Sequence, residues 1–423
     1  MARASGANSS LIAGFEAVYG AATALKYFLL PFVSAGIGGD QALIKSNLLG
    51  RGRNPQDPIL DSVNDSGDCV VPVDVRNIWF WLKLLMGAPV TTQVAAIGNF
   101  TFSAQPAANS TITLNGTAWK FVAGAPGATE VQIGANLAAT IVALATALNG
   151  SADVQTAKAT YTAAATQLLI AFDTVGIVGN AWTLAASATS NAAPSGANLT
   201  RGGYKHVFTS AAATLPSGVV ELGFPEVPSY GRNQGIGNNT MKISLASTGL
   251  LDATMSLVGQ REITFAASIA GGAATQLDTI RFGQLTGSIT RNGAQLASIT
   301  SGDFTYNNNF DLVRTIRPDG AIDGWDPGLV DVGGTITSRF ADTVLLDQAQ
   351  SQLPCDIAYG WSTPSGYALD IDTPRVFLPR PKRSVSGPQG VEVQFAWQAA
   401  LDSVTGKTCS ISLINDMAAA DYA

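Results

Sequence analysis

The sequence predicts a mainly β protein: two tandem β-sandwich or barrel units, each with a flanking α-helix, and a small inserted domain of α+β or β-sandwich-like type. Three observations lead to this prediction. One ordered set of landmarks occurs twice, short alternating runs punctuated by Gly, Asn and Pro dominate, and one copy of the landmarks is interrupted by a segment of different texture. Short strands separated by turn residues are typical of sandwiches and barrels.

We divide the 423 residues into four segments. Residues 1–95 form the N-terminal part of the first unit, and residues 96–203 form an inserted surface domain. Residues 204–300 complete the first unit and link it to the second, which comprises residues 301–423. This length suffices for two or three domains with cores of their own.

The repeated landmarks begin with residues 57–61, which lead through Gly67 to an alternating run and to a helix-like segment that opens at Asp74. Residues 326–331 lead in the same way to a helix-like segment that opens at Asp342. Three later pairs follow in the same order: residues 216–218 with 364–366, 237–243 with 387–393, and 255–258 with 411–414. The offset drops from 268 positions at the helices to 148 at the first of these pairs, so the first copy carries roughly 120 additional residues.

Each unit is predicted to contain a long loop, a strand and a helix in this order. Residues 1–30 form an arm, residues 29–37 form a strand, and residues 38–67 form a loop rich in Gly, Asn, Pro and Asp. Asp74 is a good helix N-cap. The helix that follows carries Trp79, Leu82 and Leu85 on one apolar face, and Trp81 widens this face, so we expect the helix to be buried between units or between subunits. The matching helix after Asp342 is more polar.

The inserted segment has turn and helix signals of its own. Residues 111–122 form two alternating runs around Asn115-Gly116, a strong β-hairpin signal. Residues 136–148 have helical apolar spacing and end before Asn149-Gly150. Strands are expected at residues 159–164, 167–172 and 181–186.

Beyond the insert, strands dominate the prediction. They are expected at residues 219–224, 241–246, 253–258, 262–267, 288–291, 303–306, 368–371, 391–396 and 408–414.

Composition argues for burial against other subunits and against nucleic-acid binding. Only 13% of residues are charged, the net charge is −6 and the pI is about 4.8. Cys69, Cys355 and Cys409 lie far apart in strand-like runs, which indicates buried reduced thiols. No signal peptide opens the chain, and its apolar stretches fall short of the ~20 residues that span a bilayer. We therefore expect a soluble protein made inside the cell, with no membrane partner.

No residue pattern supports catalysis, a metal or a cofactor. His206 is the sole histidine, so it lacks partners for a zinc site or a nucleophilic triad. The run Gly406-Lys407-Thr408 imitates a phosphate loop, but the required earlier glycine is Leu401. Asp370 and Asp372 would share one strand face, as a glycosidase pair could or, more commonly, as solvated side chains do. Asp326 and Asp331 lack the glycine and glutamate of a calcium loop.

Charged loop residues are the candidates for contacts between subunits. Arg51, Arg53 and Asp57 lie in the loop at residues 38–67, and Arg317 and Asp326 lie in the corresponding loop at residues 315–334. Two further loop arginines are Arg232 and Arg314. Each could pair with a neighbouring subunit or be simply solvated.

The order of the landmarks resembles that of the tail tube (major tail) proteins of long-tailed bacteriophages, of the duplicated type with an inserted domain. The matching segments are residues 1–8, 15–16, 19–20, 30–32, 48–53, 71–74, 222–224, 259–260, 306–309 and 411–416. The resemblance covers both ends and the middle of the chain but not the insert, which is similar to small modules appended to other phage virion proteins. None of these motifs is chemically diagnostic; the specificity lies in their order.

The resemblance implies a structural virion protein whose strands join around a ring, with rings that stack into a hollow tail tube and long loops that reach the next ring. Two units per chain favour rings of three chains over rings of six. Implied partners are the chain itself, the tape measure, terminator and distal tail proteins, and viral DNA that passes without specific binding. The protein would be located in the virion tail, after its synthesis in the cytoplasm of the bacterial host. The alternatives are a capsid decoration or fibre protein, and a β-sandwich polysaccharide hydrolase.

Overall fold

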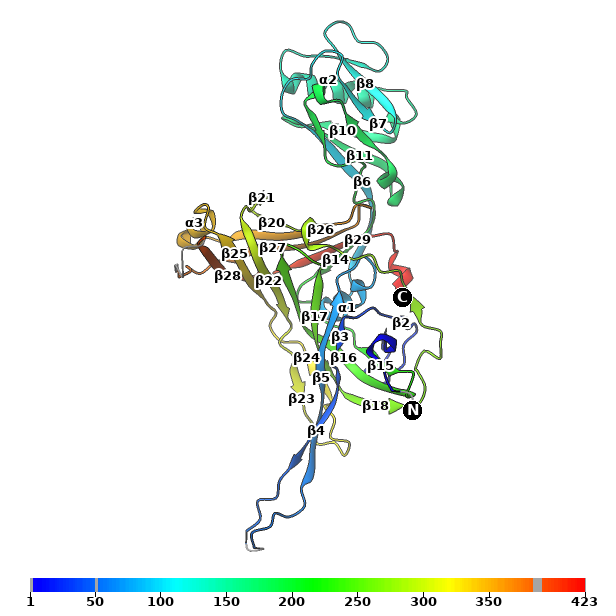
Figure 1. The fold of residues 1–423 in the computed structure, drawn as a ribbon, viewed down its shortest axis with the longest axis vertical. Helices are drawn as coiled ribbons and strands as arrows, with labels where there is room; N and C mark the ends of the chain where they lie inside the picture. The colour runs from blue at the N-terminus through cyan, green and yellow to red at the C-terminus, as the bar shows by residue number, and fades with distance from the viewer. Residues whose placement is uncertain (1–2, 50–51, 383–389, 423) are drawn as a thin grey trace.

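A computed structural model describes residues 3–49, 52–382 and 390–422. The chain is mainly β, with three α-helices in this described part. Figure 1 shows an elongated molecule with the insert at one end and the β4–β5 hairpin at the other. The described sheets are not closed into a barrel, so the sandwich alternative of the prediction is the correct one.

The first unit contains two strand layers and one buried helix. Its elements are β1 (Ser10–Phe15), β2 (Phe28–Leu29), β3 (Ser34–Ala35), β4 (Gly38–Ile44), β5 (Ile59–Pro72), α1 (Ile78–Met86), β15 (Gly218–Phe224), β16 (Ser229–Ala246), β17 (Asp252–Gly259), β18 (Arg261–Phe265) and β19 (Thr275–Gln276). The predicted strand at residues 29–37 is wrong: Pro31 lies between β2 and β3, and proline has no N–H to donate to a ladder.

The second unit repeats this order in the C-terminal third of the chain. Its elements are β20 (Ser288–Arg291), β21 (Ala294–Gln295), β22 (Ile299–Asn307), β23 (Asp311–Val313), β24 (Gly324–Asp326), β25 (Asp331–Arg339), α3 (Val344–Ser351), β26 (Cys355–Ser362), β27 (Ala368–Phe377), β28 (Glu392–Ala399) and β29 (Ser410–Asn415).

The insert has its own core, made of residues between Ala96 and Leu199. Its elements are β6 (Val90–Phe102), β7 (Thr111–Leu114), β8 (Thr117–Val122), β9 (Glu130–Gln132), α2 (Leu137–Asn149), β10 (Ala159–Ala163), β11 (Gln167–Val175), β12 (Leu184–Ala186), β13 (Ala192–Pro194) and β14 (Gly203–Thr209). The predicted hairpin and helix are both present: Asn115 and Gly116 have positive φ in the β7–β8 turn, and Asn136 caps α2. The boundaries 96 and 203 stay a prediction.

One antiparallel sheet runs through both units, in the order β3/β4–β5–β17–β16–β22–β25–β28. A second layer covers it in each unit: β2–β1–β15–β16–β18 in the first, and β20–β26–β27–β29–β14–β6 in the second. Strand β16 belongs to both layers of the first unit. We call the sheet that both units share the common sheet; Figure 1 shows α3 and β28 at one end of it.

Strand pairing shows which residues of the two units are equivalent. Cys69 of β5 pairs with Met255 of β17, and Ile336 of β25 pairs with Phe395 of β28. In the β4–β5 hairpin Ile44 pairs with Ile59, and in β23–β24 Asp311 pairs with Asp326, so the two pairs enclose segments of equal length. The offset between units is therefore 267 (336 minus 69, and 311 minus 44) before the helices and 140 (395 minus 255) after them.

These pairings correct the predicted correspondence downstream of the helices. Met255 is equivalent to Phe395, not to Ile411, and residues 364–366 lie between β26 and β27 whereas residues 216–218 lead into β15. Residues 387–389 of the predicted landmarks lie outside the described part. In the second unit only three residues join α3 to β26.

Candidate assembly interface

Helix α1 lies buried where the two units meet within one chain. Eight of its nine residues are buried, including Trp79, Trp81, Leu82 and Leu85. Trp79 stacks on Tyr422 from the C-terminus with ring centroids 4.2 Å apart. A helix that is apolar all round is stable only when it is covered on every side, and here its covering elements come from both units of the same chain.

Asp74 positions the start of α1. Its Oδ1 accepts hydrogen bonds from the backbone N–H groups of Asn77 (2.6 Å) and Ile78 (3.0 Å), and its Oδ2 accepts one from Asn77 Nδ2 at 2.6 Å. The helix begins at Ile78 rather than at Asp74, so the carboxylate caps it from outside the N-cap position. The Arg76 N–H also donates to Oδ1, at 3.1 Å. Burial raises the pKa of this carboxyl group, while the four donors oppose that shift.

Loop residues of the second unit fill a groove beside β16 and α1. Asn308 donates from Nδ2 to the Leu85 carbonyl at 2.8 Å, and the Phe310 N–H donates to Asn239 Oδ1 at 2.9 Å. Trp325 stacks on Phe310 with centroids 4.4 Å apart and donates from Nε1 to the Gly235 carbonyl at 2.9 Å.

Gly237 makes room for these two aromatic rings. A methyl group on Gly237 would lie 2.6 Å from Trp325 Cε2 and 2.7 Å from Phe310 Cε2. The junction between the units therefore consists of the β16–β22 ladder, the hydrogen bonds of Asn308 and Asn239, and two aromatic rings packed over Gly237.

Within the described residues, the common sheet ends on strands whose outer edges are unpaired or only partly paired. Strands β3 and β4 pair with β5, and their other edges have no strand partner within the described residues. At the opposite end, β28 pairs fully with β25 but with β27 only at residues 398 and 399. Unpaired edges of this kind expose N–H and C=O groups to a further strand.

The charged loop residues predicted to make subunit contacts differ in their surroundings. Arg317 is held within its own loop, by Asp319 at 3.0 Å and Asp323 at 2.9 Å. Asp326 ends β24 and is exposed, as are Arg53 and Asp57 near the tip of the β4–β5 hairpin. Arg51 lies outside the described residues. Their roles between chains stay predictions.

His206 is a satisfied core residue. Its Nδ1 lies 2.8 Å from Thr91 Oγ1, and its Nε2 lies 3.1 Å from the Met417 carbonyl, which only the Nε2–H tautomer can satisfy. The side chain is fully buried, and this burial lowers its pKa. A neutral imidazole whose two nitrogen atoms are both engaged has no free position for a substrate.

The two strand carboxylates are engaged in ion pairs with different partners. Asp370 pairs with Arg201, and Asp372 lies 3.4 Å from Lys407 Nζ. Burial raises the pKa of Asp370, and Arg201 counteracts this effect. Lys407 is thus a partner of a carboxylate and not part of a phosphate loop.

The cysteines are separate and inert. Cys69, Cys355 and Cys409 are all buried free thiols. Burial raises the pKa of Cys69 to about 12 and that of Cys355 to about 11, so little thiolate exists at neutral pH. Among residues 3–49, 52–382 and 390–422, no cluster of three metal-ligating side chains occurs.

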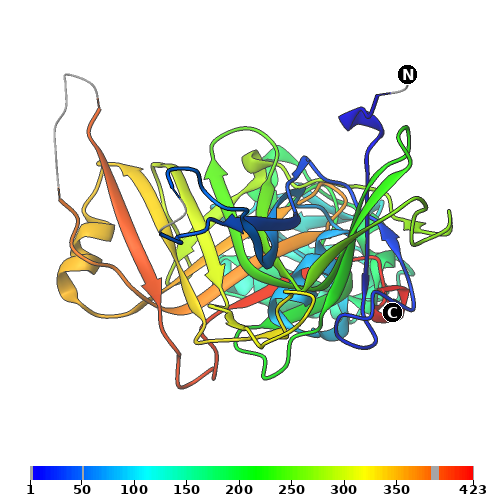
Figure 2. The same cartoon turned by 90° about the horizontal axis from the view of Figure 1, so that it is seen from below.

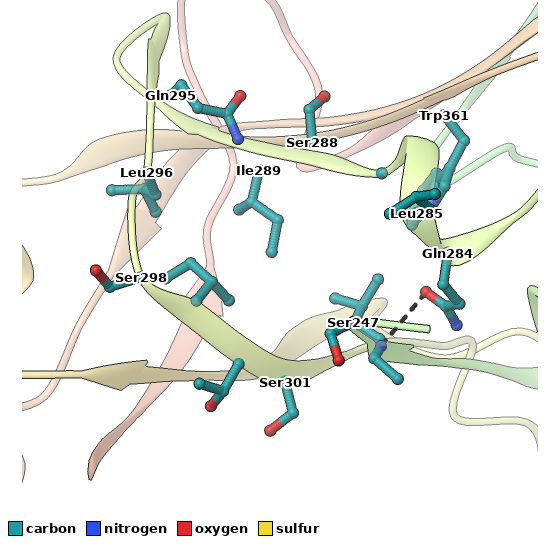
Figure 3. A pocket seen from close by; sticks show the side chains of 15 residues that line it. Ser247, Gln284, Leu285, Ser288, Ile289, Gln295, Leu296, Ser298, Ser301 and Trp361 are labelled. Carbon is teal, nitrogen blue, oxygen red and sulfur yellow. Dashed lines mark hydrogen bonds between the residues drawn. The ribbon is translucent and has the colours of Figure 1, made fainter. Parts of the chain in front are cut away.

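One cavity of about 250 Å³ lies beneath the segment that links the two units. Figure 3 shows its lining, in which Trp361, Leu285 and Ile289 face Ser247, Ser298 and Ser301. Gln284 Oε1 accepts a hydrogen bond from the Ala246 N–H at 3.3 Å. None of the lining residues is Asp, Glu, His, Cys, Lys or Arg, so the cavity has no group for acid–base chemistry or metal binding.

Asp65 is a strongly perturbed carboxyl group at the base of the β4–β5 hairpin. It is 2% exposed, and neither carboxylate oxygen has a hydrogen-bond partner. Burial, with a smaller contribution from the charge of Glu262, raises its pKa to about 7. The group lies in β5 opposite Gly39 and Gly259, which places it at the base of the protruding hairpin.

The predicted contact residues are charged loop residues and do not include Asn308, Phe310 or Trp325. The signal for these three residues is polar and aromatic: a run of three asparagines, residues 307–309, begins at the last residue of β22, and the only tryptophan of that loop precedes Asp326. Aromatic anchors are common at interfaces, whereas exposed ion pairs contribute little.

Comparison with protein families gives two matches to one model, described as phage tail tube protein, at residues 6–181 and 176–399. Two matches to a single family are what a duplicated chain produces, and together they cover most of the sequence. A comparison with curated proteins found no match. No helix of the described part is long and apolar enough to cross a bilayer.

Proposed function

Because the chain belongs to the phage tail tube protein family and is therefore a structural component of the virion tail, we propose that it assembles as rings of three chains. These rings stack into a hollow tube through which the genome passes into the host. Its family is structural and non-enzymatic. Synthesis in the bacterial cytoplasm and contacts with the tape measure, terminator and distal tail proteins are part of the same proposal.

The β16–β22 ladder carries this proposal. Seven residue pairs, from Thr240↔Asn307 to Ala246↔Ser301, join the first unit to the second inside one chain. At the unit offsets of 267 and 140, β3/β4 at one end of the common sheet is equivalent to β22, and β27, which adjoins β28 at the other end, is equivalent to β16. Repeating the junction between chains generates a head-to-tail interface, and a rotation of one third of a turn per chain closes it into a ring.

The solvent-facing side of the common sheet suits a lumen wall. Residues that alternate with the core positions are mostly Ser, Thr, Gln and Asp, such as Thr254, Ser256 and Gln394. The charged positions on this side are Asp68, Asp252, Asp303, Asp331, Glu392, Lys242 and Arg339. Five acidic against two basic groups disfavour phosphate binding, so DNA would slide without being held.

Electron microscopy of the purified full-length protein tests the proposal. We expect stacked rings with a central hole to form at high protein concentration, because ring contacts are linked to concentration. Monodisperse single chains, or particles without a hole, at every concentration and ionic strength tried would contradict it and favour a decoration or fibre role.

A further inference from the structure

The molecule exposes an apolar surface at each end of the common sheet. On the β4–β5 hairpin, Leu43 is 59% exposed, Ile59 is 66% exposed and Leu60 is 65% exposed, and these residues form the last pairs of the ladder, beyond the part of β5 that pairs with β17. Figure 1 shows this hairpin extending away from the rest of the chain, and Figure 2 views the molecule from the hairpin end. We call Leu43, Ile44, Ile59 and Leu60 the hairpin cluster.

A groove of about 660 Å³ lies at the other end of the sheet, beside α3 and β28. Its apolar lining includes Phe377, Leu378, Pro379 and Trp397, and Gln352 from the end of α3 closes one side. Phe377 is 37% exposed although it is a large aromatic side chain. We call this depression the β28 groove.

The junction between the two units of one chain shows which side chains occupy the positions equivalent to the hairpin cluster and to the β28 groove. Phe377 pairs with Gln398 in the same way that Gly237 pairs with Val258, so the β28 groove corresponds to the place where Gly237 receives Phe310 and Trp325. Leu43 and Ile44 of the hairpin correspond to Phe310 and Asp311 at the unit offset of 267.

We infer that in the assembled ring the hairpin cluster of one chain docks in the β28 groove of a second copy of the chain. This inference rests on the proposed ring and specifies its side-chain contact. Within the chain, large rings pack over a glycine; between chains, aliphatic side chains pack over Phe377. The combined side-chain volume of the two contacts is thus similar. The aromatic side chain belongs to the loop within the chain, and to the groove between chains.

Charge supports the same pairing of ends. Exposed Asp40, Asp57 and Asp61 flank the hairpin cluster, and exposed Arg380 and Lys382 follow the β28 groove. Opposite charges at the rim of an apolar contact increase its rate of formation and disfavour the reversed arrangement. Two copies that met hairpin to hairpin would bring the three carboxylates of each chain together.

Cysteine cross-linking of the full-length chain tests the docking. We expect the double variant Leu43→Cys, Phe377→Cys to form covalent dimers and trimers under mild oxidation, and each single variant to remain monomeric on a denaturing gel. The native thiols give little background because they are buried. The matched control is Leu169→Cys, Phe377→Cys, since Leu169 is 40% exposed on the insert and has no place in the proposed contact.

The outcomes separate this inference from the proposed function. Rings or tubes that form normally but give no 43–377 cross-link would overturn the docking and leave the tube intact. Cross-links that appear in stacked tubes but not in isolated rings would also overturn it, because the hairpin would then contact the next ring. Failure of the unmodified chain to form rings would instead contradict the proposed function.

A charge substitution in the hairpin cluster provides a second test of the docking. Leu60→Asp should reduce ring formation at least tenfold at a fixed concentration, because it places a charge in an apolar contact, while the folded chain keeps its unfolding temperature. Val142→Asp is the control, because Val142 is 56% exposed on the insert helix. Equal assembly of both variants would contradict the docking.

Discussion

At the scale of single residues, the two helix starts form a natural pair for comparison. Asp74 is buried and accepts hydrogen bonds from four donors at the start of α1, whereas Asp342 is exposed and accepts one, from the Val344 N–H at 3.0 Å. Loss of a cap costs about 0.5–2 kcal/mol, and buried donors left without a partner add to that cost.

We predict that Asp74→Ala lowers the free energy of unfolding by about 2–3 kcal/mol, and that Asp342→Ala lowers it by about 0.5–1 kcal/mol. Urea denaturation followed by tryptophan fluorescence measures both, because α1 carries Trp79 and Trp81. Equal effects would show that Asp74 does not hold α1 in the way described.

Asp65 should make stability depend on pH. Its pKa is about 7 in the folded chain and 3.8 for the ordinary side chain, so the folded state retains a proton that the unfolded state loses. Below pH 4 both states are protonated and there is no penalty. Stability therefore falls as the pH rises from 4 to 7, and then the loss is complete.

We predict that Asp65→Asn is more stable than the unmodified chain at pH 8, by at most about 4 kcal/mol for a shift of about three units, and nearly equal to it at pH 4. Thermal denaturation across this range measures the difference. Parallel stability curves for the two proteins would show that Asp65 is not the group responsible.

At the scale of elements, the features that could be predicted from the sequence are those that short-range chemistry determines. The Asn115-Gly116 turn and the Asn136-capped helix lie where the sequence places them, because each depends on a few adjacent residues. The burial of α1 also followed from its apolar composition on every side.

Elements that depend on distant partners were harder to assign. The equivalence of Met255 with Phe395 is determined by cross-strand pairing, and several short alternating runs match the first copy equally well. The residues that fill the unit junction, Asn308, Phe310 and Trp325, become recognisable only when the β16–β22 ladder brings them to α1.

The insert is joined to the second unit by two neighbouring strands. Val94 of β6 pairs with Gly203 of β14, so the two ends of the insert lie side by side. Arg201 pairs with Asp370, which fixes the insert against the strands beneath it. Chain ends that are adjacent and exposed tolerate removal of what lies between them.

We predict that replacing residues 96–202 by a short Gly/Ser linker still yields stacked tubes, which would place the insert on the outside of the tube. Electron microscopy of the deletion variant measures this, and a Gly/Ser insertion of equal length in the full chain controls for the linker. Folded but unassembled protein would place the insert within the ring contacts.

At the scale of the whole molecule, the low and mainly acidic charge of the chain determines how a tube made of it would interact with DNA. Only 13% of its residues are charged, and the net charge is −6. Acidic side chains also outnumber basic ones on the solvent-facing side of the common sheet. A basic wall would bind phosphates by counterion release and stop a moving duplex.

Assembled tubes mixed with linear duplex at low salt should therefore cause no retardation in a gel. The variant Asp303→Lys, Asp331→Lys serves as a positive control, since it reverses two charges of the proposed wall and should retard the duplex. Strong binding by the unmodified tube that weakens steeply with salt would contradict the proposed passage of DNA.

The central claim is that each chain supplies two equivalent positions of one ring. A reconstruction of the assembled tube by electron cryomicroscopy tests it directly. We expect three chains per ring, six similar positions around the lumen, and a continuous sheet in which the β27–β28 edge of one chain adjoins β3 and β4 of the next. Six chains per ring, or a ring in which those two edges stay apart, would contradict it.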